Sequence, residues 1–195
     1  VEVGGLVAAP ILSCHGGSAH TTMPAANLCD RDLGTSFHTL NGDTDTRWAI
    51  FTMIEAEVVT AVALVGLQVH DYPKDWTLDA RIEGAHWSAA TQLLAYSDDG
   101  TATGCAECDT AGAMAQNPGT AGPCVEDGYE CSTGPYAKVY QVPNSVAYDY
   151  YRLDVSETFE ETSYGRTNMW LKEVVLLKAA PAIVEDPVSF AADEC

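Results

Sequence analysis

The stretch that decides the fold of this 195-residue chain covers residues 26–37 and reads ANLCDRDLGTSF. Asp30, Asp32 and Thr35 place three oxygen-bearing side chains within six residues, interleaved with backbone carbonyls, in a loop too short for regular structure. Ca²⁺ takes about six to eight oxygen ligands and tolerates irregular geometry. The stretch therefore predicts a calcium-binding loop. The alternative is that Asp30 and Asp32 only stabilise a turn, as Asp side chains commonly do.

Outward from this loop, the chain is typical of a β protein. Its apolar residues form short runs, and no long stretch shows them at helical spacing. Turn-forming pairs such as Asn41-Gly42 and Asp99-Gly100 separate the runs. Seven strands are predicted, at residues 48–53, 58–69, 77–82, 92–97, 137–142, 148–155 and 171–178. Without helices to cover a parallel sheet, we expect two antiparallel sheets that bury each other's inner faces, with Trp48 and Tyr151 in the core.

Composition and charge exclude several functional classes. Hydrophobic residues make up 47% of the chain, which is enough to form one globular core. Nine Lys and Arg against 28 Asp and Glu give a net charge of -19, so the phosphate backbone of a nucleic acid would be repelled. The longest apolar run, residues 58–67, is about half of the roughly 20 residues that a membrane-spanning helix needs. We expect neither a nucleic-acid partner nor a transmembrane segment.

Seven cysteines are many for this length and indicate an oxidising compartment. The chain begins at Val1 without a basic and apolar leader, so we expect a secreted, processed segment. Cys14 precedes the proposed calcium loop, Cys29 lies directly before Asp30, and the two could bridge each other. The odd cysteine is then Cys195, which ends an extended acidic tail at residues 180–195 and is either free or bonded to another chain.

The remaining four cysteines lie in residues 104–134, a segment that is poor in large apolar residues. We expect a disulfide-stapled insertion, because closing long loops by disulfides removes entropy from the unfolded chain. Four thiolates could instead hold zinc in a tetrahedral site, although the spacing of the second pair is too long for the usual pattern. The cysteines concerned are Cys105, Cys108, Cys124 and Cys131.

Four sequence pieces occur in an order that belongs to a known family. The stretch at residues 26–37 is similar to an A-x-N-x-x-D-G-D-x-x-T-x-W entry. It is followed by RWAIF and VVTAVALVG at residues 47–51 and 58–66, by YSDDG at 96–100, and by YYRL and LKEV at 150–153 and 171–174. Together they resemble the discoidin, or coagulation-factor type C, superfamily and its galactose-binding-like carbohydrate modules. Arg31 stands where that family usually has Gly, and Phe37 where it usually has Trp.

The resemblance implies an all-β, antiparallel jelly-roll β-sandwich over residues 1–179, with the cysteine-rich segment as a loop insertion. It also implies one structural Ca²⁺ that joins the first loop to the last strand. The implied ligands are the Asn27 carbonyl, the Asp30 carboxylate, the Asp32 carbonyl, the Thr35 carbonyl and hydroxyl, and Glu173.

Sugar binding is the expected activity. Residues 70–76, HDYPKDW, bring aromatic rings, an imidazole and carboxylates together. A pyranose needs an aromatic face for stacking and fixed polar groups for its hydroxyls. The resemblance places such a site on loops at one end of the sandwich. For each aromatic candidate the alternative is packing in the core. The candidates are His38, His70, Tyr72, Trp76, Arg81, His86, Trp87 and Trp170.

We therefore expect a non-catalytic carbohydrate-binding and adhesion module that binds glycans or glycoproteins outside the cell. Catalysis is not expected, because the five histidines are scattered and Ser13, Cys14 and His15 are sequence neighbours. A nucleophile needs a base held by a third group, which sequence neighbours rarely supply. The competing hypothesis is a structural subunit of an extracellular assembly that is joined by protein contacts, including through Cys195.

Overall fold

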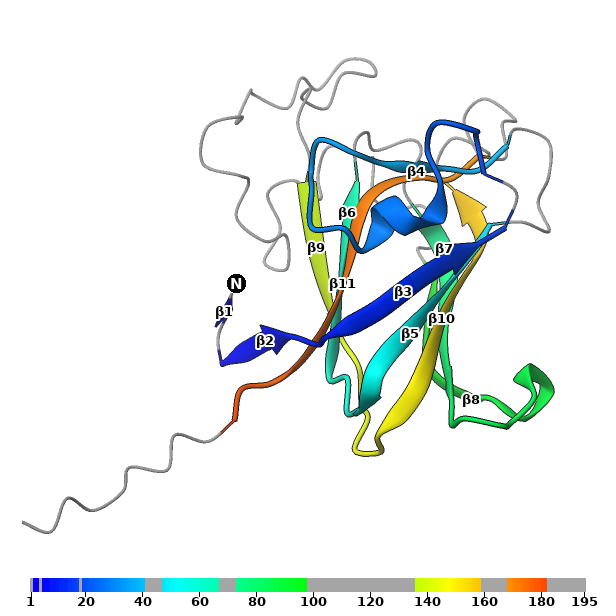
Figure 1. The fold of residues 1–195 in the computed structure, drawn as a ribbon. Helices are drawn as coiled ribbons and strands as arrows, with labels where there is room; N and C mark the ends of the chain where they lie inside the picture. The colour runs from blue at the N-terminus through cyan, green and yellow to red at the C-terminus, as the bar shows by residue number, and fades with distance from the viewer. Residues whose placement is uncertain are drawn as a thin grey trace, which may run out of the picture.

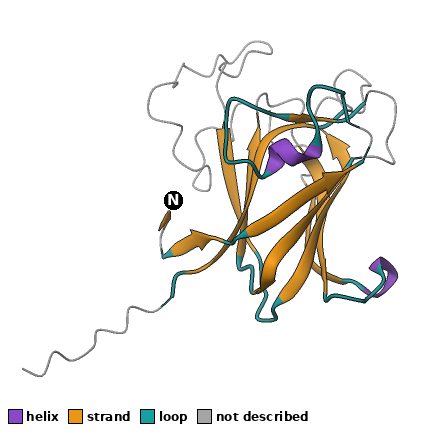
Figure 2. Cartoon of the chain, in the orientation of Figure 1, coloured by secondary structure: helices purple, strands orange, loops and turns teal. Residues whose placement is uncertain are grey.

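The fold is a sandwich of two antiparallel β-sheets (Figures 1 and 2). The computed structural model describes residues 2–3, 5–17, 19–40, 47–66, 73–97, 136–158 and 168–181. One sheet has the order β1-β2-β11-β6-β9, with β4 also paired to β11, and the other has the order β3-β5-β10-β7-β8. The predicted jelly-roll type of β-sandwich is confirmed.

The elements follow one another along the chain with few helical residues. The strands are β1 Glu2–Val3, β2 Leu6–Ala8, β3 Ile11–Gly16, β4 Phe37–His38, β5 Trp48–Glu57, β6 Ala61–Gly66, β7 Pro73–Arg81, β8 Thr91–Ser97, β9 Tyr136–Gln141, β10 Tyr148–Thr158 and β11 Trp170–Ala179. Two short 3-10 helices are described, η1 Ala25–Leu28 and η3 Trp87–Ala89. No helix in these ranges is long and apolar enough to cross a membrane.

Burial alternates along the central strands, as expected when one face of each sheet meets the other sheet. On β10, Tyr151 and Leu153 are fully buried, whereas Arg152 between them is half-buried on the outer face. The prediction that Tyr151 lies in the core is confirmed. The same prediction for Trp48 is wrong. The alternation on β5 turns its neighbour Ala49 inward and leaves Trp48 half-buried on the outer face.

The predicted strands coincide with β5 to β11, but several boundaries are wrong: β5 extends to Glu57, β7 begins at Pro73 and β10 extends to Thr158. The strand predicted to begin at Val58 begins at Ala61. Residues 58–60 instead cross from the sheet of β5 to the sheet of β6. Val59 is fully buried there, and the Thr60 N–H donates to the carbonyl of Leu177 at 2.8 Å. Residues 58–60 are largely apolar because they cross between the sheets against the core. The last part of the predicted strand, residues 67–69, lies outside the described ranges.

The strands before residue 48 were not predicted. β2 has only three residues, and β3 is separated from it by Ala9 and Pro10, so neither forms a long alternating run. Their pairing partners are distant in sequence: β2 pairs with β11 and β3 with β5. These strands are fixed by tertiary pairing, which a short sequence window does not record.

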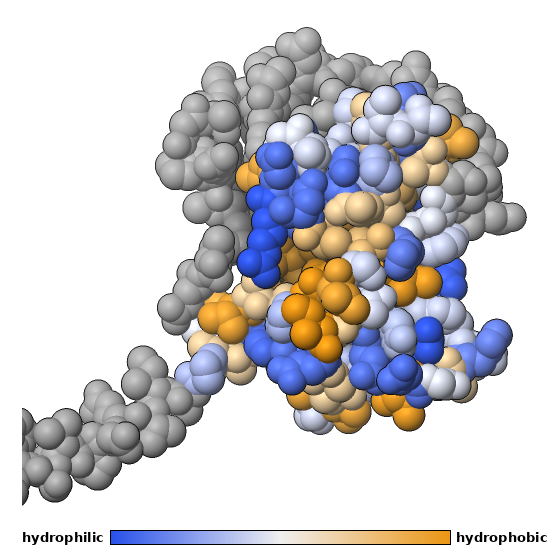
Figure 3. Space-filling view, viewed as in Figure 1, coloured by the Kyte–Doolittle hydropathy of each residue, from blue (hydrophilic) through white to orange (hydrophobic). Residues whose placement is uncertain are grey.

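The described surface mixes polar and apolar groups. On the face seen in Figure 3, apolar colour gathers most strongly over the region where β3 begins. Leu12 on β3 is 67% exposed, and Ile54 on the neighbouring β5 is 64% exposed. The Ile54 N–H donates to the Pro10 carbonyl, which ties the start of β3 to β5.

The predicted disulfide between Cys14 and Cys29 is present. It joins β3 to the residue that follows η1, and so attaches the loop of residues 26–37 to the edge of the five-stranded sheet. The insertion at residues 104–134 and the tail after Pro181 lie outside the described residues. The pairing of Cys105, Cys108, Cys124 and Cys131, the state of Cys195 and the division into sandwich and tail therefore stay predictions.

A buried tyrosine holds the crossover between the sheets. The Tyr151 hydroxyl donates to the Glu57 carbonyl at 2.5 Å and accepts the Val59 N–H at 3.2 Å. Burial is the main cause that raises the pKa of Tyr151 to about 12. The neutral Tyr151 hydroxyl thus satisfies the last carbonyl of β5 and an N–H of the crossover that leads to β6.

Replacing Tyr151 with Phe should lower the free energy of unfolding by about 1–3 kcal/mol, because a buried donor and a buried acceptor lose their partner. Urea denaturation followed by circular dichroism measures the change. Tyr150→Phe is the matched control, since this neighbour lies half-buried on the outer face. Equal unfolding free energies for Tyr151→Phe and wild type would contradict the role of the hydroxyl.

Removing the disulfide by the double substitution Cys14→Ala and Cys29→Ala should destabilise the fold. The bond closes a loop of 15 residues. In the chain-entropy model, closing a loop of this length restricts the unfolded chain and stabilises the fold by about 3 kcal/mol. The substitution is preferred to a reductant, which would also reach the other cysteines. Denaturation curves that superimpose on those of wild type would show that the bond does not stabilise the fold.

Candidate functional site

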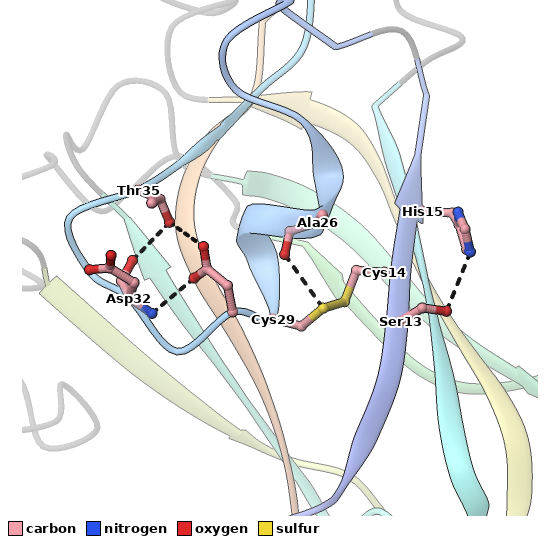
Figure 4. The surroundings of a disulfide bond; sticks show 8 residues. Ser13, Cys14, His15, Ala26, Cys29, Asp32 and Thr35 are labelled. Atoms are coloured by element: carbon pink, nitrogen blue, oxygen red, sulfur yellow. Dashed lines mark hydrogen bonds between the residues drawn. A yellow bond between two sulfur atoms is a disulfide. The ribbon is translucent and has the colours of Figure 1, made fainter.

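The loop that follows η1 is organised around the carboxylate of Asp30, which bonds Asp32 and Thr35, two residues that Figure 4 labels. Asp30 Oδ1 accepts the Asp32 N–H at 2.9 Å, and Oδ2 accepts the Thr35 hydroxyl at 2.7 Å. The Thr35 hydroxyl also lies 2.9 Å from the Asp32 carbonyl oxygen. Asn27 closes the loop, because its amide donates to the Ser36 carbonyl at 2.7 Å. The loop therefore gathers a carboxylate, a hydroxyl and a carbonyl within hydrogen-bond distance of one another.

Arg31, in the middle of this loop, has a backbone conformation that L-residues rarely adopt. Its φ is 62°, and it is the one described residue other than glycine with a positive φ. This is the position at which the resembled family usually has Gly. A side chain here costs free energy that the surrounding structure must offset. Part of the compensation is a hydrogen bond from the Arg31 backbone N–H to Glu173 on β11.

Glu173 is only 5% exposed, and it lies beside the loop. Its pairing partner is Val65 on β6. Burial, followed by the negative charge of Asp30, raises the pKa of Glu173 from its ordinary 4.5 to about 8, although the N–H and the positive charge of Arg31 act against this shift. Glu173 Oε2 is buried without a hydrogen-bond partner in the described part of the chain. A buried acceptor of this kind suits a proton or a cation.

These groups fit the oxygen chemistry of calcium. Asp30 and Thr35 supply a carboxylate and a hydroxyl, and Glu173 approaches from the last strand with an unused oxygen. Within the described ranges, no three His, Cys, Asp or Glu side chains are grouped closely enough to hold a metal by themselves. A cation here would need backbone carbonyls, such as those predicted at Asn27, Asp32 and Thr35. Ca²⁺ commonly accepts such ligands.

A second cluster lies where β4 meets the start of β11, at the upper end of the sandwich in Figure 1. His38 and Trp170 are directly paired, and their ring centroids are 5.0 Å apart. The Asn168 amide nitrogen lies 3.1 Å from His38 Nε2. The ring of His20, which is exposed, lies 6.2 Å from that of His38. Two imidazoles, an indole and an amide therefore gather at one end of the fold.

Backbone bonds hold this second cluster in place. The His20 N–H donates to the His38 carbonyl at 2.9 Å. Thr39, which is fully buried, accepts the Met169 N–H on its hydroxyl at 2.9 Å and donates its own N–H to the Met169 carbonyl at 3.0 Å. The segments that present His20, His38 and Trp170 are thus fixed to one another. The indole Nε1 of Trp170 is buried without a partner in the described residues.

The structure separates the other predicted sugar-binding residues from this cluster. Trp76 is 1% exposed and packs against Tyr140 in the core, so it is not available for a ligand and the prediction is wrong for this residue. Alternation on β7 turns Trp76 inward and Arg81 outward. Arg81 and Trp87 lie on the outer face of the five-stranded sheet, and His86 accepts the Ser88 N–H at the start of η3. His70 and Tyr72 lie outside the described residues.

His20 and Asn168 were not among the predicted residues. His20 is exposed in a segment without a motif, and Asn168 precedes β11 by two residues. The pairing of β4 with β11 brings Asn168 to His38, and the backbone bridge between Ala19 and Thr39 brings His20 there. An available signal was the Asn-Met-Trp sequence directly before the last predicted strand, because loop residues at strand ends often bind ligands.

Ser13 and His15 form a pair that superficially resembles a nucleophile and its base. Ser13 Oγ lies 3.3 Å from His15 Nε2, and both are on β3 (Figure 4). No described carboxylate bonds the other nitrogen of His15, so the orienting group that catalysis needs is missing from the described residues. Cys14 between them is bonded to Cys29, so its sulfur is not a nucleophile.

No family model matches this sequence, and no curated protein matches it. The solved structures do provide likenesses. The family 32 carbohydrate-binding module of NanJ from C. perfringens, solved in complex with galactose, superimposes with a TM-score of 0.55 at 10% identity, over 89% of this chain and 99% of that one. The module CpGH89CBM32-4 from Clostridium perfringens, in complex with GlcNAc-α-1,4-galactose, gives 0.52 at 12% identity, over 91% and 97%.

A larger structure, truncated AlyQ with CBM32 and alginate lyase domains, superimposes with a TM-score of 0.54 at 13% identity. The match covers 90% of this chain but 34% of that one. At these identities the likenesses show the fold alone. This chain therefore has the galactose-binding-like β-sandwich fold of family 32 carbohydrate-binding modules, which the sequence motifs had indicated.

The burial of Glu173 predicts a pH dependence of stability in metal-free protein. The pKa of this carboxyl is higher in the folded state than the 4.5 of an unfolded chain, so the folded state binds the proton more tightly. We therefore compare the unfolding free energies of wild type and Glu173→Gln in EDTA. The difference, wild type minus variant, should fall as pH rises from 4.5 towards 8. Thermal unfolding of both proteins across this range measures the difference. A difference that is constant with pH would contradict the raised pKa.

Proposed function

We propose that this chain is a non-catalytic carbohydrate-binding module that holds a neutral sugar at the cluster of His20, His38, Asn168 and Trp170. The observation that supports the proposal most strongly is the direct pairing of His38 with Trp170, with ring centroids 5.0 Å apart at one end of the sandwich. The structural neighbours are carbohydrate-binding modules, which supports the same class of activity.

The cluster offers the two kinds of contact that a pyranose needs. The half-buried indole of Trp170 is suited to stack on the apolar face of a sugar. The imidazoles and the Asn168 amide can donate to and accept from hydroxyl groups. The net charge of -19 would repel acidic glycans at long range, so a neutral sugar is favoured. The NanJ module was solved with galactose and CpGH89CBM32-4 with a galactose-containing disaccharide. Galactose-terminated glycans are therefore the first ligands to test.

We infer further that the loop around Asp30 holds a structural Ca²⁺. The ligands would be the Asn27 carbonyl, the Asp30 carboxylate, the Asp32 carbonyl, the Thr35 carbonyl and hydroxyl, and Glu173. A divalent cation would offset the negative charges of buried Glu173 and exposed Asp30, which repel each other. Because Glu173 and Trp170 are both on β11, a cation bound to Glu173 would also help to position the sugar cluster.

The working environment that we propose is extracellular, where the module would attach its polypeptide to glycans of a surface or matrix. The disulfide between Cys14 and Cys29 supports this assignment, because such bonds persist in oxidising compartments.

Isothermal titration with lactose and a panel of galactose-terminated glycans tests sugar binding. Trp170→Ala and His38→Ala should each weaken binding at least tenfold, which corresponds to about 1.4 kcal/mol. His86→Ala is the matched control, because it removes an exposed imidazole that caps η3 and is not part of the cluster. If no glycan of a broad panel binds wild-type protein, the proposed function is wrong.

The same titration in EDTA and after calcium is restored separates the two proposals. Calcium should raise the unfolding temperature of wild type but not of Glu173→Gln or Asp30→Asn, and it should tighten sugar binding only indirectly. Thr22→Ala is a suitable control, since Thr22 bonds His20 and is not a proposed calcium ligand. An unfolding temperature that does not respond to calcium would remove the metal and leave sugar binding to stand or fall by itself.

A further inference from the structure

The outer face of the five-stranded sheet presents two arginines interleaved with three aromatic rings. We call this set the arginine–aromatic ladder; its members are Trp48, Arg152, Trp87, Arg81 and Tyr150. Strand register places Trp48 beside Asp154, Arg152 beside Ile50 and Asp79, and Tyr150 beside Arg81. Trp87 comes from η3, in the connection between β7 and β8.

The ladder is a continuous series of cation–π contacts. The Arg152 guanidinium carbon lies 5.2 Å from the ring centroid of Trp48 and 5.7 Å from that of Trp87. The Arg81 guanidinium carbon lies 4.8 Å from the Trp87 centroid and 3.9 Å from that of Tyr150. Contacts of this kind hold long side chains in one arrangement. A ligand that used these side chains would therefore not have to order them first.

Backbone and ionic bonds fix the arginines further without using all of their donors. Arg81 Nη1 donates to the Ala85 carbonyl at 2.8 Å, and Arg152 Nη2 donates to Asp154 at 2.6 Å. The Nε atoms of both arginines are buried and have no partner in the described part of the chain, so the donors left for a ligand are on the terminal nitrogens. All five members of the ladder are half-buried, so each keeps some accessible surface.

The charge of this face favours an uncharged ligand. Asp154 is paired with Arg152, and Asp79 lies opposite Arg152 in the register. Burial, followed by the charge of Asp154, raises the pKa of Asp79. Negative charge therefore already competes for Arg152, and an anionic chain would meet both aspartates. A neutral polyhydroxyl ligand would instead find acceptors in the aspartates and donors in the arginines.

The size of the ladder favours a chain of several sugars over a single one. Trp48 pairs with Asp154 and Tyr150 with Arg81, so the ladder extends over five residues of β10, whose four steps span about 13 Å along a strand. Aromatic rings distributed along a sheet face suit successive pyranoses, each of which has an apolar face.

We propose that the arginine–aromatic ladder is a second glycan-binding surface, which takes an extended, neutral oligosaccharide along the outer face of the five-stranded sheet. It is separate from the cluster of His38 and Trp170, which lies on the other sheet where β4 pairs with β11. This proposal does not depend on the function proposed for that cluster. Two surfaces on one module would raise the avidity for a glycan able to reach both.

Affinity electrophoresis of the full chain in gels that contain hydroxyethylcellulose, glucomannan, mixed-linkage β-glucan or polygalacturonate, none of which carries terminal galactose, tests this proposal. At least one of the three neutral polysaccharides should retard the wild-type protein. Trp87→Ala and Trp48→Ala should each weaken that retardation, with a dissociation constant at least tenfold higher than that of wild type. Ile82→Ala is the matched control, because Ile82 is 55% exposed in the same connection as Trp87 and is not part of the ladder. His38→Ala should leave the retardation unchanged.

A spectroscopic measurement keeps the test valid if a ladder variant is unstable. In Trp170→Phe the remaining tryptophans are Trp48, Trp76 and Trp87, and Trp76 is buried in the core. A neutral polysaccharide that binds the ladder should change the fluorescence of this variant. The proposal is overturned if no neutral polysaccharide retards the protein, if only polygalacturonate does, if Trp87→Ala behaves as wild type, or if His38→Ala abolishes retardation.

Discussion

The burial of Glu173 next to Asp30 is the constraint on which the described arrangement depends. A carboxylate that is buried beside a second, exposed carboxylate is costly to keep charged without compensation. The loop compensates by donating the Arg31 backbone N–H to Glu173. Arg31 has a left-handed backbone conformation there. The Asp30 carboxylate at the same time accepts two hydrogen bonds that shape its own loop. The loop around Asp30 and the last strand are thereby coupled by the charges of Asp30 and Glu173 and by the hydrogen bond from Arg31 to Glu173.

The last strand extends that constraint through the molecule. β11 pairs with β2, β4 and β6, so it is the centre of the six-stranded sheet. It begins with Trp170 beside His38, and three residues later it presents Glu173 to the loop around Asp30. Val174 and Leu176 on the same strand are fully buried in the core. Glu173 therefore lies three residues from Trp170 on the same strand, although the Glu173 side chain is not part of the proposed sugar cluster.

The fold does not decide which ligand is bound, because the same sandwich supports different sites in different proteins. In this chain, two described surfaces combine aromatic rings with polar groups. One lies at the end of the sandwich and is small, as suits a single sugar. The other follows the strands of the five-stranded sheet and is long. The sheet geometry accounts for both, since strand ends gather side chains from several segments and strand faces arrange them in rows.

The sequence by itself determined the positions of β5 to β11, the oxygen-rich loop at residues 26–37 and the nearby cysteines Cys14 and Cys29. These are local properties, set by residues near one another in the chain. Only the tertiary structure decided that Trp76 is buried while Trp48 is half-exposed, because alternation defines two faces but the opposite sheet selects the inner one. It also decided that Asn168 meets His38 across 130 residues, because strand pairing, not sequence proximity, brings them together.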